Sequence, residues 1–291
     1  MLFGFSGLFA KLIGLPAPFI VLGRSVFAVA ILAIIIYATK NSGLLRLKTK
    51  RDYCALTLLG GVLALHWSTF FYAIQASSVA IGLLSTSTFP VFAAFLEPLI
   101  MRKRIKAKNV ILAAITLYAI SLMVPHIQFN SHDTTGMLLG LISGFSFALL
   151  IVLNKHYAAR YSSLTVVFYQ TAGSVIATLP VLFFTPAALF QPKNIVLLAV
   201  LGVVFTAASH TLFVKGMAHV NAQIATVLAS LEPVYGILIA IPLLGEMPTL
   251  RTIVGGVIIL TVAYIASSGI TIAGIKRLLR PADEPATLPN S

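Results

Sequence analysis

Three charged side chains stand inside or beside long apolar stretches of the chain, where a buried charge costs about 3 kcal/mol or more in lipid and needs a reason. Glu232 could bind and release a proton or hold the amine of a solute; alternatively, it is a structural acid beside Pro233. The guanidinium of Arg24 could hold a solute carboxylate, and the amine of Lys11 could contact a ligand. For both basic residues the alternative is an anchor at the lipid headgroups.

Histidines, aromatic rings and hydroxyl groups recur at helical spacing in two apolar stretches. Residues 53–74 and residues 195–216 each place such side chains on one helical face. A shift of 143 residues superposes the two faces, so we expect them to line a cavity with aromatic walls and a few polar groups. The alternative is that these side chains only pack the helices together, through small residues and hydroxyl groups, and bind no ligand. The predicted solute-binding residues are His66, Trp67, Phe70, Ser87, Ser209, His210, Phe213 and Ser230.

Motifs of enzymes, metal centres and ATP-driven pumps are missing from the sequence. It contains no HExxH or GxSxG motif and no GxxxxGK[ST] phosphate-binding loop. The six histidines are scattered, and the single cysteine, Cys54, cannot form an intramolecular disulfide or a thiolate metal cage. We therefore expect no enzyme, no catalytic residues, no metal and no cofactor.

The composition is that of a membrane protein. Of the 291 residues 59% are hydrophobic and only 9% are charged, and the mean hydropathy is +1.01, whereas soluble proteins carry about 25% charged residues. A helix that crosses a bilayer needs about 20 apolar residues. Ten apolar runs reach or approach that length, which predicts an all-α membrane protein with ten transmembrane helices. The runs are residues 1–15, 19–39, 53–74, 79–101, 109–126, 136–155, 165–185, 195–216, 222–244 and 252–275.

Basic residues orient the predicted spans, because Lys and Arg near span ends stay on the cytoplasmic side. Most of the 20 basic residues lie in alternate connections, above all in residues 40–51 and 102–108. This pattern places both termini in the cytoplasm and favours the plasma membrane, which for a bacterium is the inner membrane. The basic residues are divided among short loops, so no nucleic acid is expected. The tail, residues 276–291, is predicted to be a disordered cytoplasmic segment.

The two halves of the chain resemble each other weakly. Residues 66–124 align without a gap with residues 209–267, and Phe70 then meets Phe213. Each half contains five spans, so the second half is inverted in the membrane relative to the first, a plan found in many secondary transporters. We expect two inverted five-helix domains around a central cavity: residues 1–126, with a truncated first helix of about 22 Å, and residues 136–275.

Three stretches resemble a known family of membrane carriers. They are GFSGLFAK at 4–11, FFYAIQASSVAIGLLSTSTFPVFAAFLEPLI at 70–100 and LFVKGMAHVNAQIATVLASLEPVYGILIAIPLLGE at 212–246. They are similar to the drug/metabolite transporter superfamily and, within it, to the EamA-type family of ten-helix carriers. The Gly-Glu pair that ends the fourth helix of each repeat in this family stands here as Gly245-Glu246, whereas the first repeat has Arg102 and Lys103. The resemblance implies a carrier of small metabolites that works by alternating access.

These observations together predict a secondary-active transporter of small metabolites, with export as the expected direction. Amino-acid-like solutes and amphipathic drug-like solutes both suit aromatic walls with a few polar groups. The expected partners are a small-molecule solute and the lipid bilayer; protons are a candidate coupling ion, and a homodimer is left open. An intramembrane enzyme and a channel-like subunit without vectorial coupling are the alternatives.

Overall fold

The computed structural model describes residues 2–39, 42–124, 131–184, 191–219 and 231–267, and within these ranges the chain forms helices and turns without a β-strand. Two sequence predictions, the binding residue Ser230 and the disordered tail 276–291, lie outside the described residues. The helices are α1 (Leu2–Ser6), α2 (Phe9–Leu12), α3 (Ala17–Ala38), η1 (Ser42–Leu45), α4 (Lys50–Ala76), α5 (Val79–Thr86), α6 (Phe89–Ile100), α7 (Ala107–Met123), α8 (His132–Ala158), α9 (Ser163–Thr178), η2 (Leu179–Phe184), α10 (Pro192–Gly202), η4 (Val203–Ala208), α11 (Ser209–His219), α13 (Glu232–Leu244) and α14 (Leu250–Ser267).

Six segments of the described chain are long and apolar enough to cross a bilayer. The helices α7, α13 and α14 are apolar but shorter, and the first apolar run forms only the two short helices α1 and α2. The prediction of an all-helical membrane protein is confirmed, whereas the count of ten crossings stays a prediction. The six long segments are Ala17–Ala38, Lys50–Ala76, Val79–Ile100, His132–Ala158, Ser163–Phe184 and Pro192–Gly216.

The fourth predicted span, residues 79–101, forms two helices that are separated next to a proline. α5 ends at Thr86, and α6 begins at Phe89 with Pro90 in its first turn. Proline has no N–H, so it fits the first turn of a helix, where that group has no intrahelical partner. α13 begins in the same way, with Pro233 in its first turn, and the shift of 143 residues superposes Pro90 on Pro233.

Two glycines allow α1 and α8 to approach the start of α13 and the turn between α5 and α6 closely. A Cβ atom on Gly4 of α1 would lie 2.8 Å from the carbonyl oxygen of Glu232, and one on Gly144 of α8 would lie 2.7 Å from the carbonyl oxygen of Thr86. The tripeptide Gly-Phe-Ser begins at both positions, 4 and 144. Through this tripeptide the first half packs α1 against the start of α13, and the second half packs α8 against the turn between α5 and α6.

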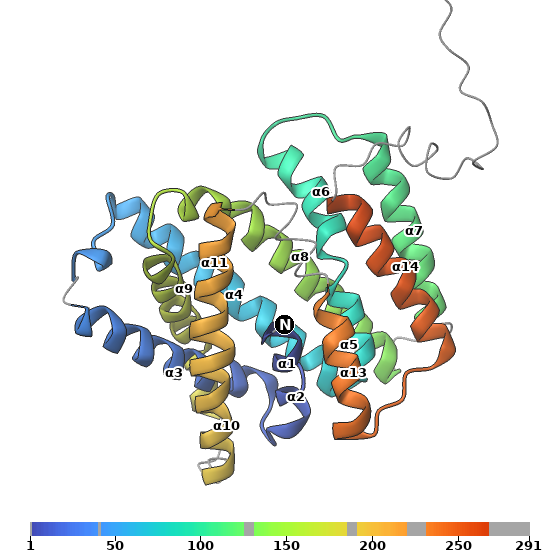
Figure 1. The fold of residues 1–291 in the computed structure, drawn as a ribbon, viewed down its shortest axis with the longest axis horizontal. Helices are drawn as coiled ribbons and strands as arrows, with labels where there is room; N and C mark the ends of the chain where they lie inside the picture. Colours follow the sequence, from blue (N-terminus) through green and yellow to red (C-terminus); the bar gives the residue numbers. More distant parts are fainter. Residues whose placement is uncertain (1, 40–41, 125–130, 185–190, 220–230, 268–291) are drawn as a thin grey trace, which may run out of the picture.

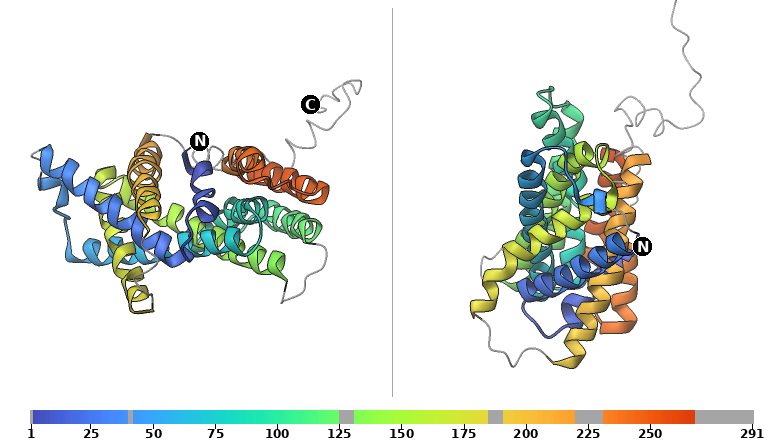
Figure 2. Two further views of the ribbon diagram at one scale, coloured as in Figure 1. Left: turned by 90° about the horizontal axis from the view of Figure 1, so that it is seen from below. Right: turned by 90° about the vertical axis from the view of Figure 1, so that its left-hand side faces the viewer.

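The helix α4 lies at the centre of the fold and packs mainly against α8 and α9. In Figure 1, α3, α9, α10 and α11 gather on one side and α6, α7, α13 and α14 on the other, while α4 and α8 run between the two groups. Figure 2 shows the same separation from below, with the N-terminal segment between the groups. The main hydrophobic core follows α4 and contains Leu63, Phe71 and Ile74.

One end of the helix bundle, here called the basic end, consists of the connections 42–49, 101–106 and 159–162. The hydroxyl of Tyr161 donates to Oδ2 of Asp52 at 2.6 Å and accepts the N–H of Lys48 at 3.0 Å. Burial and the bond to Asp52 raise the pKa of Tyr161, so the donating hydroxyl stays protonated at neutral pH. An ion pair between Lys155 and Glu97, 3.3 Å long, joins the ends of α8 and α6.

The opposite end, here called the Lys11 end, gathers the connections before α3, α5 and α14. Nζ of Lys11 lies 3.6 Å from Oε1 of Glu246 and donates to the carbonyl oxygen of Ser77 at 3.0 Å. Oε2 of Glu246 accepts the backbone N–H of Val79 at 2.7 Å, at the start of α5. Gly245 adopts a left-handed conformation with φ of 69° at the end of α13, which suits glycine and turns the chain towards this cluster.

The crossing of α4 and α9 depends on two glycines whose backbones touch. A Cβ atom on Gly60 would overlap the carbonyl oxygen of Gln170 and would lie 2.6 Å from Cα of Gly173, whereas one on Gly61 would meet no atom within 4 Å. We expect Gly60→Ala to lower the thermal stability of the detergent-solubilised protein by several degrees, because the helices must separate. The matched variant Gly61→Ala should leave stability unchanged or raise it, since alanine favours helix by about 1 kcal/mol. Equal melting temperatures for the two variants would contradict this packing.

Candidate functional site

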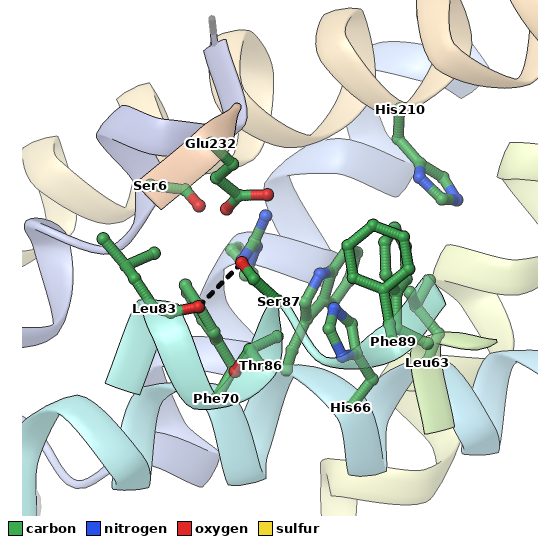
Figure 3. Close-up of a pocket in the computed structure, with 13 residues that line it drawn as sticks. Ser6, Leu63, His66, Phe70, Leu83, Thr86, Ser87, Phe89, His210 and Glu232 are labelled. Carbon is green, nitrogen blue, oxygen red and sulfur yellow. Dashed lines mark hydrogen bonds between the residues drawn. The ribbon is translucent and has the colours of Figure 1, made fainter. Parts of the chain in front are cut away.

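A cavity lies where the turn between α5 and α6, the start of α13 and the central helix α4 meet (Figure 3). The space free of protein atoms, outlets included, is about 550 Å³, but it is so narrow that the centres of water molecules have only about 30 Å³. That is room for about two or three waters, so a larger solute requires the walls to move. The lining residues are Ser6, Arg24, Leu63, His66, Trp67, Phe70, Leu83, Thr86, Ser87, Phe89, Phe147, His210 and Glu232.

Arg24 of α3 is almost completely buried beside this cavity, with 1% of its surface exposed. Its Nε donates to Oγ1 of Thr206 at 2.8 Å, and its Nη2 donates to the carbonyl oxygen of Phe205 at 3.4 Å. Its guanidinium carbon lies 4.0 Å from the centre of the Trp67 ring, a cation–π distance. An anchor at the lipid headgroups does not fit this placement, which leaves Arg24 as a charge aimed at the cavity.

His66 of α4 is held from the side of α8. Its Nδ1 lies 2.9 Å from Oγ and 3.0 Å from the carbonyl oxygen of Ser143. Its ring stacks on Phe147 with 4.7 Å between ring centres, and Phe89 meets Phe147 edge-on at 4.9 Å. The hydrogen bonds fix the ring of His66, and the aromatic residues form an apolar wall next to it.

His210 of α11 begins a chain of buried polar side chains that leads away from the cavity. Its Nε2 lies 3.3 Å from Oε1 of Gln170, and Nε2 of Gln170 donates to Oδ1 of Asn154. Its ring also meets the ring of Trp67 at 6.1 Å in an edge-on arrangement. The chain therefore connects the cavity to α9 and to the last turns of α8, near the basic end.

Glu232 reaches the cavity from the first turn of α13, where the partial positive charge of the helix N-terminus favours an anion. Figure 3 shows Glu232 and Ser6 on the side of the cavity opposite Ser87 and Thr86. Under the shift of 143 residues the counterpart of Glu232 is Phe89, which also lines the cavity. The two halves thus place a carboxylate and an aromatic ring at equivalent positions, the first residues of α13 and α6.

The structure brings most of the predicted site residues together, but not all of them. The lining residues that the sequence predicts are His66, Trp67, Phe70, Ser87, His210, Arg24 and Glu232. Ser209 and Phe213 do not line the cavity. The hydroxyl of Ser209 donates instead to the carbonyl oxygen of Phe205 at 2.6 Å, and the ring of Phe213 stacks on that of Phe147 with 6.1 Å between ring centres. Lys11 also lies away from the cavity, in the ion pair with Glu246.

Several lining residues were not among the predicted site residues. Ser6 and Phe147 come from the regions that follow Gly4 and Gly144, and the recurrence of Gly-Phe-Ser is the signal that could have found both. Leu63, Leu83 and Phe89 are apolar and carry no such signal. Within the described residues, His, Cys, Asp and Glu form no cluster of three or more that could hold a metal ion.

Comparisons with known proteins agree on one family. The chain matches the EamA-like transporter family over residues 1–124 and 134–268. An uncharacterised transporter of Archaeoglobus fulgidus is 32% identical over 201 residues, which cover 68% of this chain and 71% of that protein. The S-adenosylmethionine uptake transporter of Rickettsia prowazekii is 25% identical, covering 80% and 76%. The pseudopaline exporter CntI of Pseudomonas aeruginosa is 28% identical, covering 87% of each.

A solved crystal structure has the same fold, with a TM-score of 0.66 and 16% sequence identity over 91% of this chain and 94% of the other. The family match covers nearly all of the described helices, including those that line the cavity. This protein therefore belongs to the EamA-like transporter family, within the drug/metabolite transporter superfamily.

Proposed function

We propose that this protein is a secondary-active transporter that carries one small solute at a time through the cavity by alternating access. The observation that carries the proposal is the position of the cavity, between the interruption of α5 and α6 in the first half and the start of α13 in the second. Half-helix ends of this kind, deep in the bilayer, form the solute sites of many secondary transporters. The polar and aromatic lining around Arg24, His66 and Glu232 supplies the few oriented groups that a small-molecule site needs.

The proposed architecture has two inverted five-helix repeats, residues 1–126 and 136–275, and ten crossings. Two contacts support it, because each joins helices that are equivalent under the repeat: α3 with α9, and α7 with α14. Figure 1 shows the last pair side by side at one edge of the molecule. If a pseudo-twofold axis relates the two repeats, the helices next to that axis contact their own equivalents, as these pairs do.

The two ends of the bundle supply the candidate gates. Lys11 and Glu246 join α2 to α13 at one end, and Lys155 and Glu97 join α8 to α6 at the other. Both are partly exposed ion pairs, which contribute about 1 kcal/mol or less each. Breaking the ion pair at either end therefore costs little free energy, so that end can open when a solute occupies the narrow cavity.

We propose export of amino-acid-like or amphipathic solutes as the physiological activity. The exporter from Pseudomonas aeruginosa is matched over 87% of this chain, slightly more than the uptake transporter from Rickettsia prowazekii at 80%. Uptake remains the alternative direction, and a homodimer stays a prediction. The basic end then faces the cytoplasm of a bacterial cell, with both termini on that side of the inner membrane.

Cysteine labelling checks this orientation, because the chain has a single native cysteine, Cys54. In a Cys54→Ser background, we expect cysteines at Arg46 and Arg102 to react with an impermeant thiol reagent only after the cytoplasmic face is opened. A cysteine at Met247, which is 77% exposed at the Lys11 end, should react in intact cells. Opposite accessibility of positions 46 and 102 would contradict the repeat architecture.

Counterflow of a labelled solute in proteoliposomes tests the transport proposal. The solute is first chosen by a thermal-shift screen of amino acids and hydrophobic amines. We expect saturable counterflow, and we expect His210→Ala to lower its rate about tenfold, the effect of losing about 1.4 kcal/mol. His156→Ala is the matched control, since His156 is exposed and bonds to Arg160 at the basic end. A non-saturable flux would favour a channel, and turnover of the solute without movement would favour an enzyme.

A proton role for Glu232 has a separate test. Within the cavity this carboxylate shares its surroundings with Arg24, His66 and His210. If Glu232 carries the coupled proton, Glu232→Gln abolishes the pH dependence of transport while leaving counterflow active, because counterflow requires no net proton movement. A pH profile identical to that of the unmodified protein would assign proton coupling to another group.

A further inference from the structure

The guanidinium of Arg24 presents one unused edge. Thr206 and the carbonyl oxygen of Phe205 occupy Nε and Nη2, but within the described residues Nη1 has no hydrogen-bond partner, although it is buried. The rings of Trp67 and Phe71, 4.0 Å and 5.4 Å from the guanidinium carbon, hold the group in place. A buried charged donor without a partner is costly, so its persistence needs an explanation.

Among the described residues, Glu232 is the one carboxylate that lines the same cavity, and it makes no hydrogen bond to Nη1 of Arg24. Glu232 lies close enough for its charge to act on Arg24, yet the ion pairs within 4.0 Å in the described chain are those of Lys11, Lys155 and Arg160. The two opposite charges thus lie apart, with the cavity between their helices α3 and α13. Oγ1 of Thr86, a further lining group, likewise has no partner within the described residues.

We propose that Arg24 binds the carboxylate of the transported solute through Nη1, and that the solute is a zwitterion whose ammonium group lies on the side of Glu232. A guanidinium edge is a strong donor to a carboxylate. A simple anion would meet repulsion from Glu232, and a simple cation would meet repulsion from Arg24, whereas a zwitterion satisfies both charges. The apolar remainder of the solute packs against Phe70, Phe89 and Phe147.

This inference rests on the proposed function only in taking the cavity as the solute site, and it can be tested by binding alone. Trp67 is the only tryptophan of the chain, and it lies directly under Arg24. The fluorescence of Trp67 therefore reports binding of a solute at Arg24, which is called the subsite below. The probes are L-phenylalanine, phenethylamine and 3-phenylpropionate, which share an aromatic ring and differ in whether they carry a carboxylate, an ammonium group or both.

We expect the zwitterion to bind at least about tenfold more tightly than either singly charged probe, the effect of one charge-assisted hydrogen bond. Arg24→Gln should remove the preference for L-phenylalanine over phenethylamine, and Glu232→Gln should remove the preference over 3-phenylpropionate. Ser25→Ala is the matched control for loss of a buried polar group on α3, because Ser25 bonds to Ser174 and does not line the cavity. It should keep both preferences.

Equal binding of phenethylamine and L-phenylalanine to the unmodified protein would overturn the inference, as would no response of Trp67 to any of the three probes. The comparison of probes needs no variant, so it decides the matter even if Arg24→Gln does not fold. Selective binding without counterflow in proteoliposomes would keep the subsite and refute the transport function. Counterflow of L-phenylalanine unaffected by Arg24→Gln would keep the transport function and refute the subsite.

Discussion

The low-dielectric interior of a membrane protein requires every backbone polar group to find a partner, and this constraint governs the whole arrangement around the cavity. A helix can break there only where other parts of the protein cover the freed groups. Between α5 and α6 the hydroxyls of Ser87 and Thr88 meet the requirement, because they donate to the carbonyl oxygens of Leu83 and Ser85. Gly144 lets α8 approach this turn closely, and Gly4 lets α1 approach the start of α13. The same close packing places Ser6 and Phe147 at the cavity. The contacts of α1 and α8 with the other half of the chain therefore also supply part of the cavity lining.

Charge is distributed unevenly over this symmetrical frame. The carboxylate of Glu232 comes from the second half and has Phe89 as its counterpart, while the guanidinium of Arg24 comes from the first half. The glutamate of the Gly245-Glu246 pair also exists only in the second half, although Arg102 repeats the left-handed conformation of Gly245 with φ of 52°. The backbone plan is thus shared by both halves, but the charges that act at the cavity and at the Lys11 end are not.

Much of the site could be predicted from the sequence, because histidine and charged residues are rare inside apolar helices and helical spacing identifies their faces. His66, Trp67 and His210 were found in this way. The failures have local causes. The hydroxyl of Ser209 bonds to the backbone of its own helix, at Phe205, and the partner of Lys11 is Glu246, far along the chain. Apolar lining residues such as Leu63 look the same as the rest of the core, so only the fold distinguishes them.

The crossing of α4 and α9 has a mechanical consequence. At Gly60 and Gly173 the two backbones touch, with no interlocked side chains between them. Tightly interdigitated helices resist rotation because side chains must change rotamer, whereas a smooth glycine contact lets one helix swivel on the other. The angle between α4 and α9 can therefore change at this contact without a change of side-chain rotamer.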